Sequence, residues 1–307
     1  MKWLHRWSAI VGASAIGVAT ASAAASEDAP RAMSLGQAAV LGAIEGLTEY
    51  LPVSSTGHLF VAERLMKLSS NAQEQAVCDS FGIAIQLGAI LAVIGLYFGR
   101  IRCMTLGLLG RDPAGFRLLS RLLAAFLPAA VIGLVFKQRI EQCLFGPWPI
   151  ALAWAVGGLA ILGAGRVWRG RPSPIGEIEE LSLRAALLIG LAQALALWPG
   201  VSRSLVTIAG GLVAGLRPRA AVEFSFLLGL VTLGAATTYE IVRHGRDMVN
   251  LFGWAAPLLG LAVAFITAGA SMRWMVRYLQ TRSFAIFGWY RLAAAAVTAS
   301  LILSGRL

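Results

Sequence analysis

The chain has 307 residues, of which 58% are hydrophobic and only 13% are charged. Its mean hydropathy of +0.74 excludes a soluble globular domain and predicts a polytopic membrane protein. A formal net charge of +11 could indicate a nucleic-acid ligand, but the Lys and Arg residues are spread between apolar runs, so no nucleic-acid partner is expected.

The first 25 residues have the pattern of a secretory signal peptide. Lys2 and Arg6 precede an apolar stretch at 8–19, and small residues at 21–25 provide a cleavage signal. Such a segment is removed from the mature protein and is left out of the predicted fold. An uncleaved first helix is the alternative. In either case a single membrane-embedded domain is expected over 33–307.

Six long apolar runs follow, each of about 20 residues, which is the length that a helix needs to cross ~30 Å of hydrocarbon. They predict transmembrane helices over 81–98, 118–136, 148–165, 222–242, 251–270 and 284–304. Two further stretches, 35–68 and 184–216, are apolar but are interrupted by Pro, Gly and polar residues. The predicted fold class is therefore an all-α polytopic membrane protein.

The basic residues predict how these segments are oriented. Thirteen Lys and Arg residues lie in one set of connections, which comprises 99–117, 166–184, 217–221 and 271–283. Only four lie in the alternate set, which comprises 69–80, 137–147 and 243–250. The positive-inside rule makes the first set cytoplasmic. This orientation is consistent only if both interrupted stretches are re-entrant helical hairpins, the first open to the outside and the second to the inside.

The chain thus divides into two halves, about 35–165 and 184–304, each a hairpin followed by three spans in opposite orientation. Residues also match at a constant offset of 148, pairing Gly42 with Gly190, Glu45 with Gln193, Tyr50 with Trp198, Val53-Ser54 with Val201-Ser202 and Thr56 with Ser204. This is an inverted-topology repeat, in which the paired broken segments meet near the membrane midplane and form the site.

The first interrupted stretch contains "EGLTEYLPVSSTGH" (45–58). Glu45 and Glu49 are four residues apart and therefore share one face of a helix. Two carboxylates can hold a hard divalent cation such as Mg²⁺ or Ca²⁺ through oxygen, or share a proton as a base. A single buried Glu can be a packing residue, but two of them beside a His and an Arg favour a functional site.

Hydroxyl groups follow the acids. Pro52 ends the helix, Ser54, Ser55 and Thr56 follow, and a second helix is expected to restart at His58. Hydroxyls and free backbone N–H groups at a helix start form a phosphate cradle. Ordinary helix capping is the alternative for each of them. His58 is expected to donate or accept a proton.

The second interrupted stretch, "WPGVSRSLVT" (198–207), repeats this device with an arginine added. The planar guanidinium of Arg203 suits phosphate oxygens, and at membrane depth its only other explanation is pairing with a Glu. Ser202, Ser204 and Thr207 surround it. Together the two stretches predict a dry pocket for a phosphorylated ligand.

These segments resemble the two signature motifs of the bacterial undecaprenyl-diphosphate phosphatase family, which is associated with bacitracin resistance. Further similarity lies in "FGIAIQLGAILAV", "LPAAVIGLVF", "AVEFSFLLG" and "FGWYR", so that the resemblance spans about residues 35–304. It implies hydrolysis of undecaprenyl diphosphate to undecaprenyl phosphate and inorganic phosphate, which recycles the lipid carrier for peptidoglycan and other envelope polymers. It also implies an inner-membrane enzyme with a periplasm-facing site and a divalent cation.

The resemblance assigns roles to individual residues. The acidic pair of the family corresponds to Glu45 and Glu49, its serine to Ser54 with His58 after it, and its phosphate-binding arginine to Arg203. Ser54 is expected to be the nucleophile or a close phosphate ligand, activated by Glu49 or His58. The flanking hydroxyls are expected to bind phosphate; they belong to Ser55, Thr56, Ser202, Ser204 and Thr207.

Three positions depart from the family pattern. Leu205 replaces a glycine, Gly82 replaces an acidic residue and Val231 replaces a proline, and the first of these bears on rate or substrate range. A prenyl-phosphate transporter or flippase with the same fold is the alternative function, and release of inorganic phosphate would separate the two. The sequence leaves the metal, the prenyl chain length and the presence of a homo-oligomer open.

Overall fold

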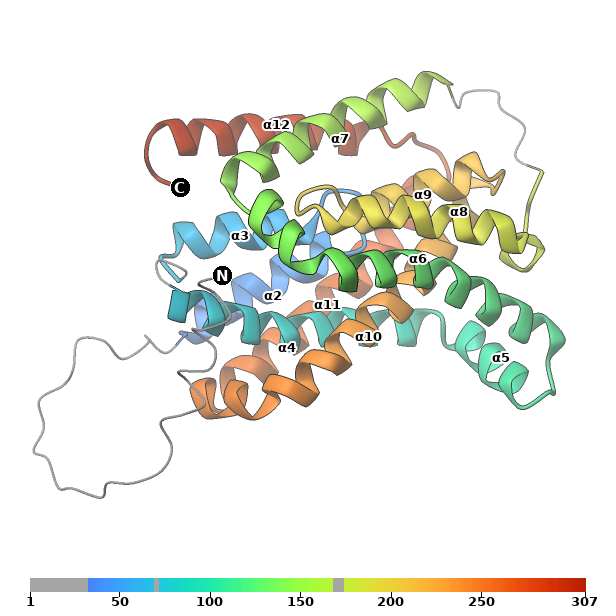
Figure 1. The fold of residues 1–307 in the computed structure, drawn as a ribbon, viewed down its shortest axis with the longest axis horizontal. Helices are drawn as coiled ribbons and strands as arrows, with labels where there is room; N and C mark the ends of the chain where they lie inside the picture. Colours follow the sequence, from blue (N-terminus) through green and yellow to red (C-terminus); the bar gives the residue numbers. More distant parts are fainter. Residues whose placement is uncertain (1–32, 69–71, 168–173) are drawn as a thin grey trace, which may run out of the picture. The chain divides into compact units, whose positions relative to one another are not determined.

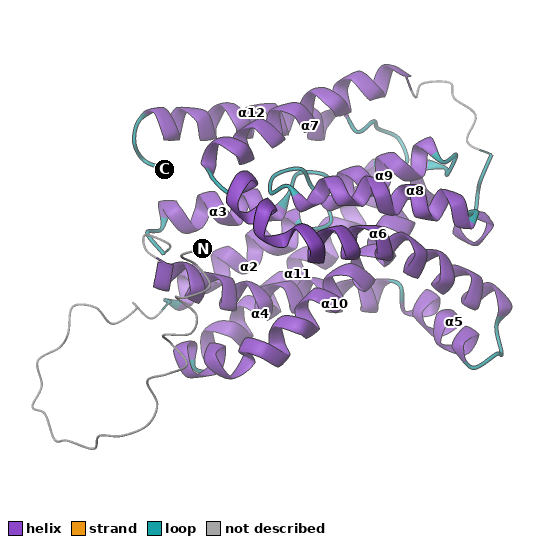
Figure 2. Ribbon diagram, in the orientation of Figure 1, coloured by secondary structure: helices purple, strands orange, loops and turns teal. Residues whose placement is uncertain are grey.

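The computed structural model describes residues 33–68, 72–167 and 174–307. Within these ranges every regular element is a helix, and the only β-structure is one isolated bridge between Ile175 and Leu216 (Figures 1 and 2). The predicted signal peptide lies outside the described residues. The predicted all-α fold is confirmed for the part of the chain that is described.

The α-helices in chain order are α2 (Leu35–Thr48), α3 (Ser55–Leu65), α4 (Ala72–Leu96), α5 (Phe98–Leu108), α6 (Pro113–Leu144), α7 (Pro147–Val167), α8 (Leu183–Ala194), α9 (Arg203–Val213), α10 (Pro218–Phe252), α11 (Ala255–Tyr278) and α12 (Ala285–Leu303). Two short 3₁₀ helices are η1 (Ile178–Glu180) and η2 (Leu195–Leu197). Among the described residues, six helices are long and apolar enough to cross a membrane: α4, α6, α7, α10, α11 and α12. They coincide with the six predicted spans, which are therefore confirmed.

One helix was not expected. The segment at 99–117 contains α5, although its four arginines are typical of a connection between spans. Arg100 donates from Nε to Glu223 of α10 at 2.6 Å and also pairs with Glu179 of η1. These contacts join a basic connection of the first half to one acidic residue between the halves and to one in the second half, and they give the α5 segment a fixed place.

The broken helices begin at matched capping residues. Ser34 accepts from the backbone N–H of Gln37, and Ser182 accepts from that of Ala185, which satisfies a donor that a helix start leaves unpaired. The two serines are 148 residues apart. The same spacing therefore recurs in the structure at the residues that cap α2 and α8.

The halves also exchange contacts in a matched way. Helix α2 of the first half packs against α11, and α8 of the second half packs against α6. At the closest approach, a Cβ on Gly42 would meet the carbonyl of Gly260, and a Cβ on Gly190 would meet that of Ala125. Glycine at these two positions permits both crossings, which supports the predicted repeat.

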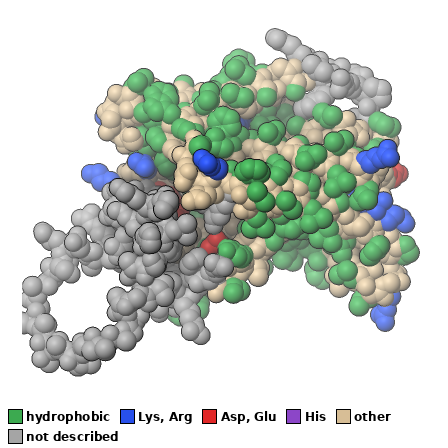
Figure 3. Space-filling model, in the orientation of Figure 1, with side chains coloured by type: hydrophobic (Ala, Val, Ile, Leu, Met, Phe, Trp, Pro, Cys, Tyr) green, Lys and Arg blue, Asp and Glu red, His purple; other side chains and the backbone are tan. Residues whose placement is uncertain are grey.

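The outer surface differs from that of a soluble protein. Large apolar side chains are widely exposed, among them Leu134 (78%), Val242 (80%) and Val213 (68%). Figure 3 shows hydrophobic side chains over much of the visible face, with a group of basic side chains at its right-hand edge. Soluble monomers rarely expose such extensive apolar surface, whereas lipid-facing helices require it.

Candidate active site

The first interrupted stretch breaks its helix sharply. Helix α2 ends at Thr48, and α3 begins at Ser55. Pro52 cannot donate a backbone hydrogen bond, and Ser54 has a φ of +73°, a region that residues other than glycine seldom adopt. We call residues 49–54 the first break.

The second interrupted stretch repeats this geometry. After η2 the chain turns through Trp198 to Val201, and Ser202 takes a φ of +75° before α9 begins at Arg203. We call residues 198–202 the second break. Ser54 and Ser202 are 148 residues apart, so the strained positions of the two breaks are equivalent in the predicted repeat. Strain of this kind persists only where the surroundings enforce it and is common at functional sites.

Hydroxyl groups join the two breaks to each other. Ser204 Oγ donates to the Leu51 carbonyl at 2.7 Å and lies 3.0 Å from Ser202 Oγ. Thr207 Oγ1 donates to the Arg203 carbonyl at 2.8 Å and lies 2.6 Å from the hydroxyl oxygen of Ser225. Ser204 and Thr207 are fully buried. In this state these two hydroxyls, which were expected to bind phosphate, bind the protein itself.

An ion pair forms the centre of the site. Arg203 Nη2 lies 3.1 Å from Glu49 Oε1, and Arg203 Nη1 donates to the Ser225 carbonyl at 3.0 Å. The guanidinium carbon stands 5.5 Å from the centre of the Tyr50 ring. The other Glu49 oxygen accepts a hydrogen bond from Ser55 Oγ. The structure thus unites Glu49, Ser55 and Arg203 from both halves.

This ion pair leaves donor capacity unused. Arg203 Nε is buried without a hydrogen-bond partner among the described residues. A buried charged group without its full set of partners is costly. The free donor therefore suits an acceptor such as a phosphate oxygen, for which guanidinium groups have matching geometry.

Glu45 lies one helical turn before Glu49 and is 2% exposed. Its Oε1 has no hydrogen-bond partner within the described part of the chain. No group of three or more His, Cys, Asp and Glu residues that could hold a metal ion occurs among the described residues. Two carboxylates, Glu45 and Glu49, are buried at the end of α2. This set fits Mg²⁺, which proteins often bind through one or two carboxylates together with substrate phosphates.

His58 is held on a different side of the first break. Its Nδ1 donates to the Ser54 carbonyl at 2.6 Å, because a carbonyl can only accept. Its Nε2 lies 2.7 Å from the hydroxyl oxygen of Tyr290, and the two rings are stacked. The Trp154 ring adjoins His58 as well, and its Nε1 donates to the Val53 carbonyl. Thr56, on the first turn of α3, is exposed.

Sequence reasoning missed Arg291, which is fully buried on α12. Its guanidinium donates to the carbonyls of Ala153 and Gly200 at 2.8 Å and of Pro52 at 3.3 Å. Pro52 and Gly200 are again 148 residues apart, so one side chain holds equivalent points of the two breaks. An arginine inside an apolar span is itself a signal, because such a residue is expensive in a membrane.

The chain is similar to known proteins over most of its length. The family model described as bacitracin resistance protein BacA matches residues 38–297. An undecaprenyl-diphosphatase from Sorangium cellulosum is 45% identical over 262 residues, which cover 85% of this chain and 84% of the relative. Undecaprenyl-diphosphatase 2 from Rhodospirillum rubrum is 44% identical over 273 residues, or 88% of this chain and 95% of the relative. This chain therefore belongs to the family of the bacitracin resistance protein BacA.

Proposed function

We propose that this protein hydrolyses undecaprenyl diphosphate to undecaprenyl phosphate and inorganic phosphate. This reaction recycles the lipid carrier of envelope polymers and underlies resistance to bacitracin. The names of its relatives support the proposal. The observation that carries it is the buried cluster of Glu49, Ser55 and Arg203, in which an acid, a hydroxyl and a cation with a free donor meet.

In the proposed mechanism Arg203 binds the terminal phosphate, with the N–H groups at the starts of α3 and α9 completing the cradle. A serine oxygen attacks the terminal phosphorus and forms a new P–O bond, while its proton passes to Glu49. The bond to the bridging oxygen breaks, and this oxygen leaves with undecaprenyl phosphate after Glu49 passes the proton to it, so that Glu49 is again free to act as a base. Water then cleaves the phosphoserine and releases inorganic phosphate, and Glu49 acts as the base for this step.

Two serines are candidates for the nucleophile. The resemblance favours Ser54, whereas the hydrogen bond to Glu49 favours Ser55, because a nucleophile needs a base within reach of its proton. The backbone strain at Ser54 allows the roles of the two serines to be tested separately. Ser54→Gly suits a φ of +73°, so it removes the hydroxyl without adding strain. We expect Ser55→Ala to abolish phosphate release and Ser54→Gly to retain it; the opposite result would return the role to Ser54.

A divalent cation would be held by Glu45 and Glu49. When bound, it would neutralise charge on the phosphoryl oxygens during transfer. The unpartnered oxygen of Glu45 supports this assignment, since a buried carboxylate requires a proton, a donor or a cation.

The proposal extends to the membrane arrangement. We place the protein in the bacterial inner membrane, with the two interrupted stretches as re-entrant hairpins of an inverted repeat and with the site facing the periplasm. The excess of basic residues in alternate connections supports this orientation. The matched caps, breaks and crossings of the two halves support the repeat.

The deciding experiment is phosphate release from a C55 prenyl diphosphate by the purified protein in detergent. We expect wild type to release phosphate, and Glu49→Gln and Arg203→Ala to lose about 10²–10³ in rate. Circular dichroism and gel filtration of each variant would verify that it is folded. A folded wild type that binds the lipid but releases no phosphate would refute the proposal and favour a prenyl-phosphate transporter.

A further inference from the structure

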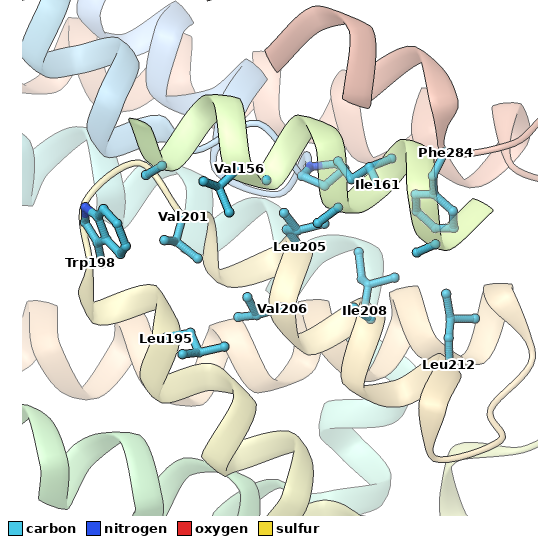
Figure 4. Close-up of a pocket in the computed structure, with 16 residues that line it drawn as sticks. Val156, Ile161, Leu195, Trp198, Val201, Leu205, Val206, Ile208, Leu212 and Phe284 are labelled. Carbon is cyan, nitrogen blue, oxygen red and sulfur yellow. The ribbon is translucent and has the colours of Figure 1, made fainter. Parts of the chain in front are cut away.

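An apolar cavity of about 390 Å³ lies between α7 and α9 beside the two breaks (Figure 4). All of its lining residues are apolar. The α7 wall carries small side chains such as Ala153, Gly157 and Ala160, while α9 presents larger ones such as Leu205, Ile208 and Leu212. A cavity with no polar lining offers no hydrogen bonds to water, so its preferred occupant is an apolar group.

The cavity borders the two breaks that carry the proposed catalytic cluster. Pro52 of the first break and Trp198 and Val201 of the second break form its wall near the cluster. Arg203 follows two residues after Val201, and its guanidinium reaches Glu49. A molecule with a phosphate at Arg203 and an apolar body can therefore contact both sites at once.

We infer that this cavity binds isoprenyl units of the substrate and that Leu205 limits which chains fit. The inference rests on the proposed function. The volume of the cavity corresponds to about 13 water molecules at ~30 Å³ each. If one heavy atom of the chain replaces each water, the cavity holds roughly two to three five-carbon units. The branched side chains of α9 would face the methyl branches of such a chain. A C55 diphosphate would place only part of its chain here, and the rest would remain in the lipid.

Leu205 has a special place in this cavity. Figure 4 shows its side chain between Val201 and Ile208, directed across the gap toward α7. A glycine at this position would leave that volume open. Lipid is as apolar as the cavity, so transfer of the chain releases little hydrophobic free energy, and the fit of the side chains decides which chains bind. Leu205 is therefore assigned as a specificity-determining residue.

The test compares C55 and C15 prenyl diphosphates as substrates for wild type and two cavity variants. Ala160→Phe fills the cavity from the α7 wall, and Leu205→Ala enlarges it. We expect Ala160→Phe to raise KM for the C55 substrate about tenfold and Leu205→Ala to lower this KM. The expected size follows because one methylene group in an apolar pocket changes substrate discrimination by about tenfold or more.

Val213→Ala is the matched control, because Val213 lies on α9 but is 68% exposed and does not line the cavity. If wild type releases no phosphate from either substrate, the proposed function fails. If release proceeds but KM for both substrates is the same in all variants, the inference about the cavity fails while the function stands. In that case an acyl chain of the surrounding lipid is its occupant.

Discussion

Gly229→Ala is predicted to inactivate the protein without unfolding it. Gly229 lies on α10 next to the guanidinium of Arg203. A Cβ added there would stand 2.5, 2.6 and 2.7 Å from Nη1, Nη2 and the central carbon of Arg203. An ordinary contact is about 3.5 Å, so the guanidinium must retreat by about 1 Å.

The retreat acts on catalysis far more than on stability. Alanine favours a helix over glycine by about 1 kcal/mol, which offsets part of the ~1.5–3 kcal/mol lost with one charge-assisted hydrogen bond of Arg203. The free energy of unfolding should thus fall by only about 0.5–2 kcal/mol. A misplacement of 1 Å at a reacting group costs on the order of 10² in rate, so kcat/KM should fall about 100-fold.

The assay is phosphate release from a C55 prenyl diphosphate, measured beside thermal unfolding in the same detergent. Gly234→Ala is the matched control, because Gly234 lies on the same helix and a Cβ there meets nothing within 4 Å. It should keep full activity. A fully active Gly229→Ala, or equal losses in both variants, would refute the reasoning that the position of Arg203 controls the reaction.

Three further predictions concern the surroundings of the cluster. Arg291→Met removes the donor to the carbonyls of Pro52 and Gly200, so it should lower the free energy of unfolding by about 2–6 kcal/mol, with Arg291→Lys intermediate; an unchanged thermal midpoint would contradict this role. Tyr290→Phe removes the hydroxyl beside His58 Nε2 and should leave kcat within about twofold, because Glu49 carries the protons in the proposed mechanism; a 10- to 100-fold loss of kcat at constant KM would instead bring His58 into proton transfer. Excess chelator should stop phosphate release and added Mg²⁺ or Ca²⁺ should restore it; full activity in chelator would remove the cation from the mechanism.

Local properties of the chain were sufficient to predict the spans and the breaks. The length and hydropathy of an apolar run are enough to mark a transmembrane helix, and all six runs correspond to such helices. The cost of polar residues in a membrane likewise singled out Glu49 and Arg203, and these two residues are paired in the structure. Helix α5 was missed because its arginines resemble those of a connection, and the acidic partners of Arg100 come from distant segments.

The sequence by itself singled out the candidate residues for the chemistry, since residue type and spacing already place acids, hydroxyls and an arginine at two helix breaks. Only the tertiary structure decided how they are combined. It directs Ser55 rather than Ser54 to Glu49, assigns His58 to Tyr290, and joins the breaks through Arg291. These contacts link residues far apart in the chain or depend on the direction of a side chain at a strained backbone. Residue order does not encode either property locally, because both arise only when the helices pack.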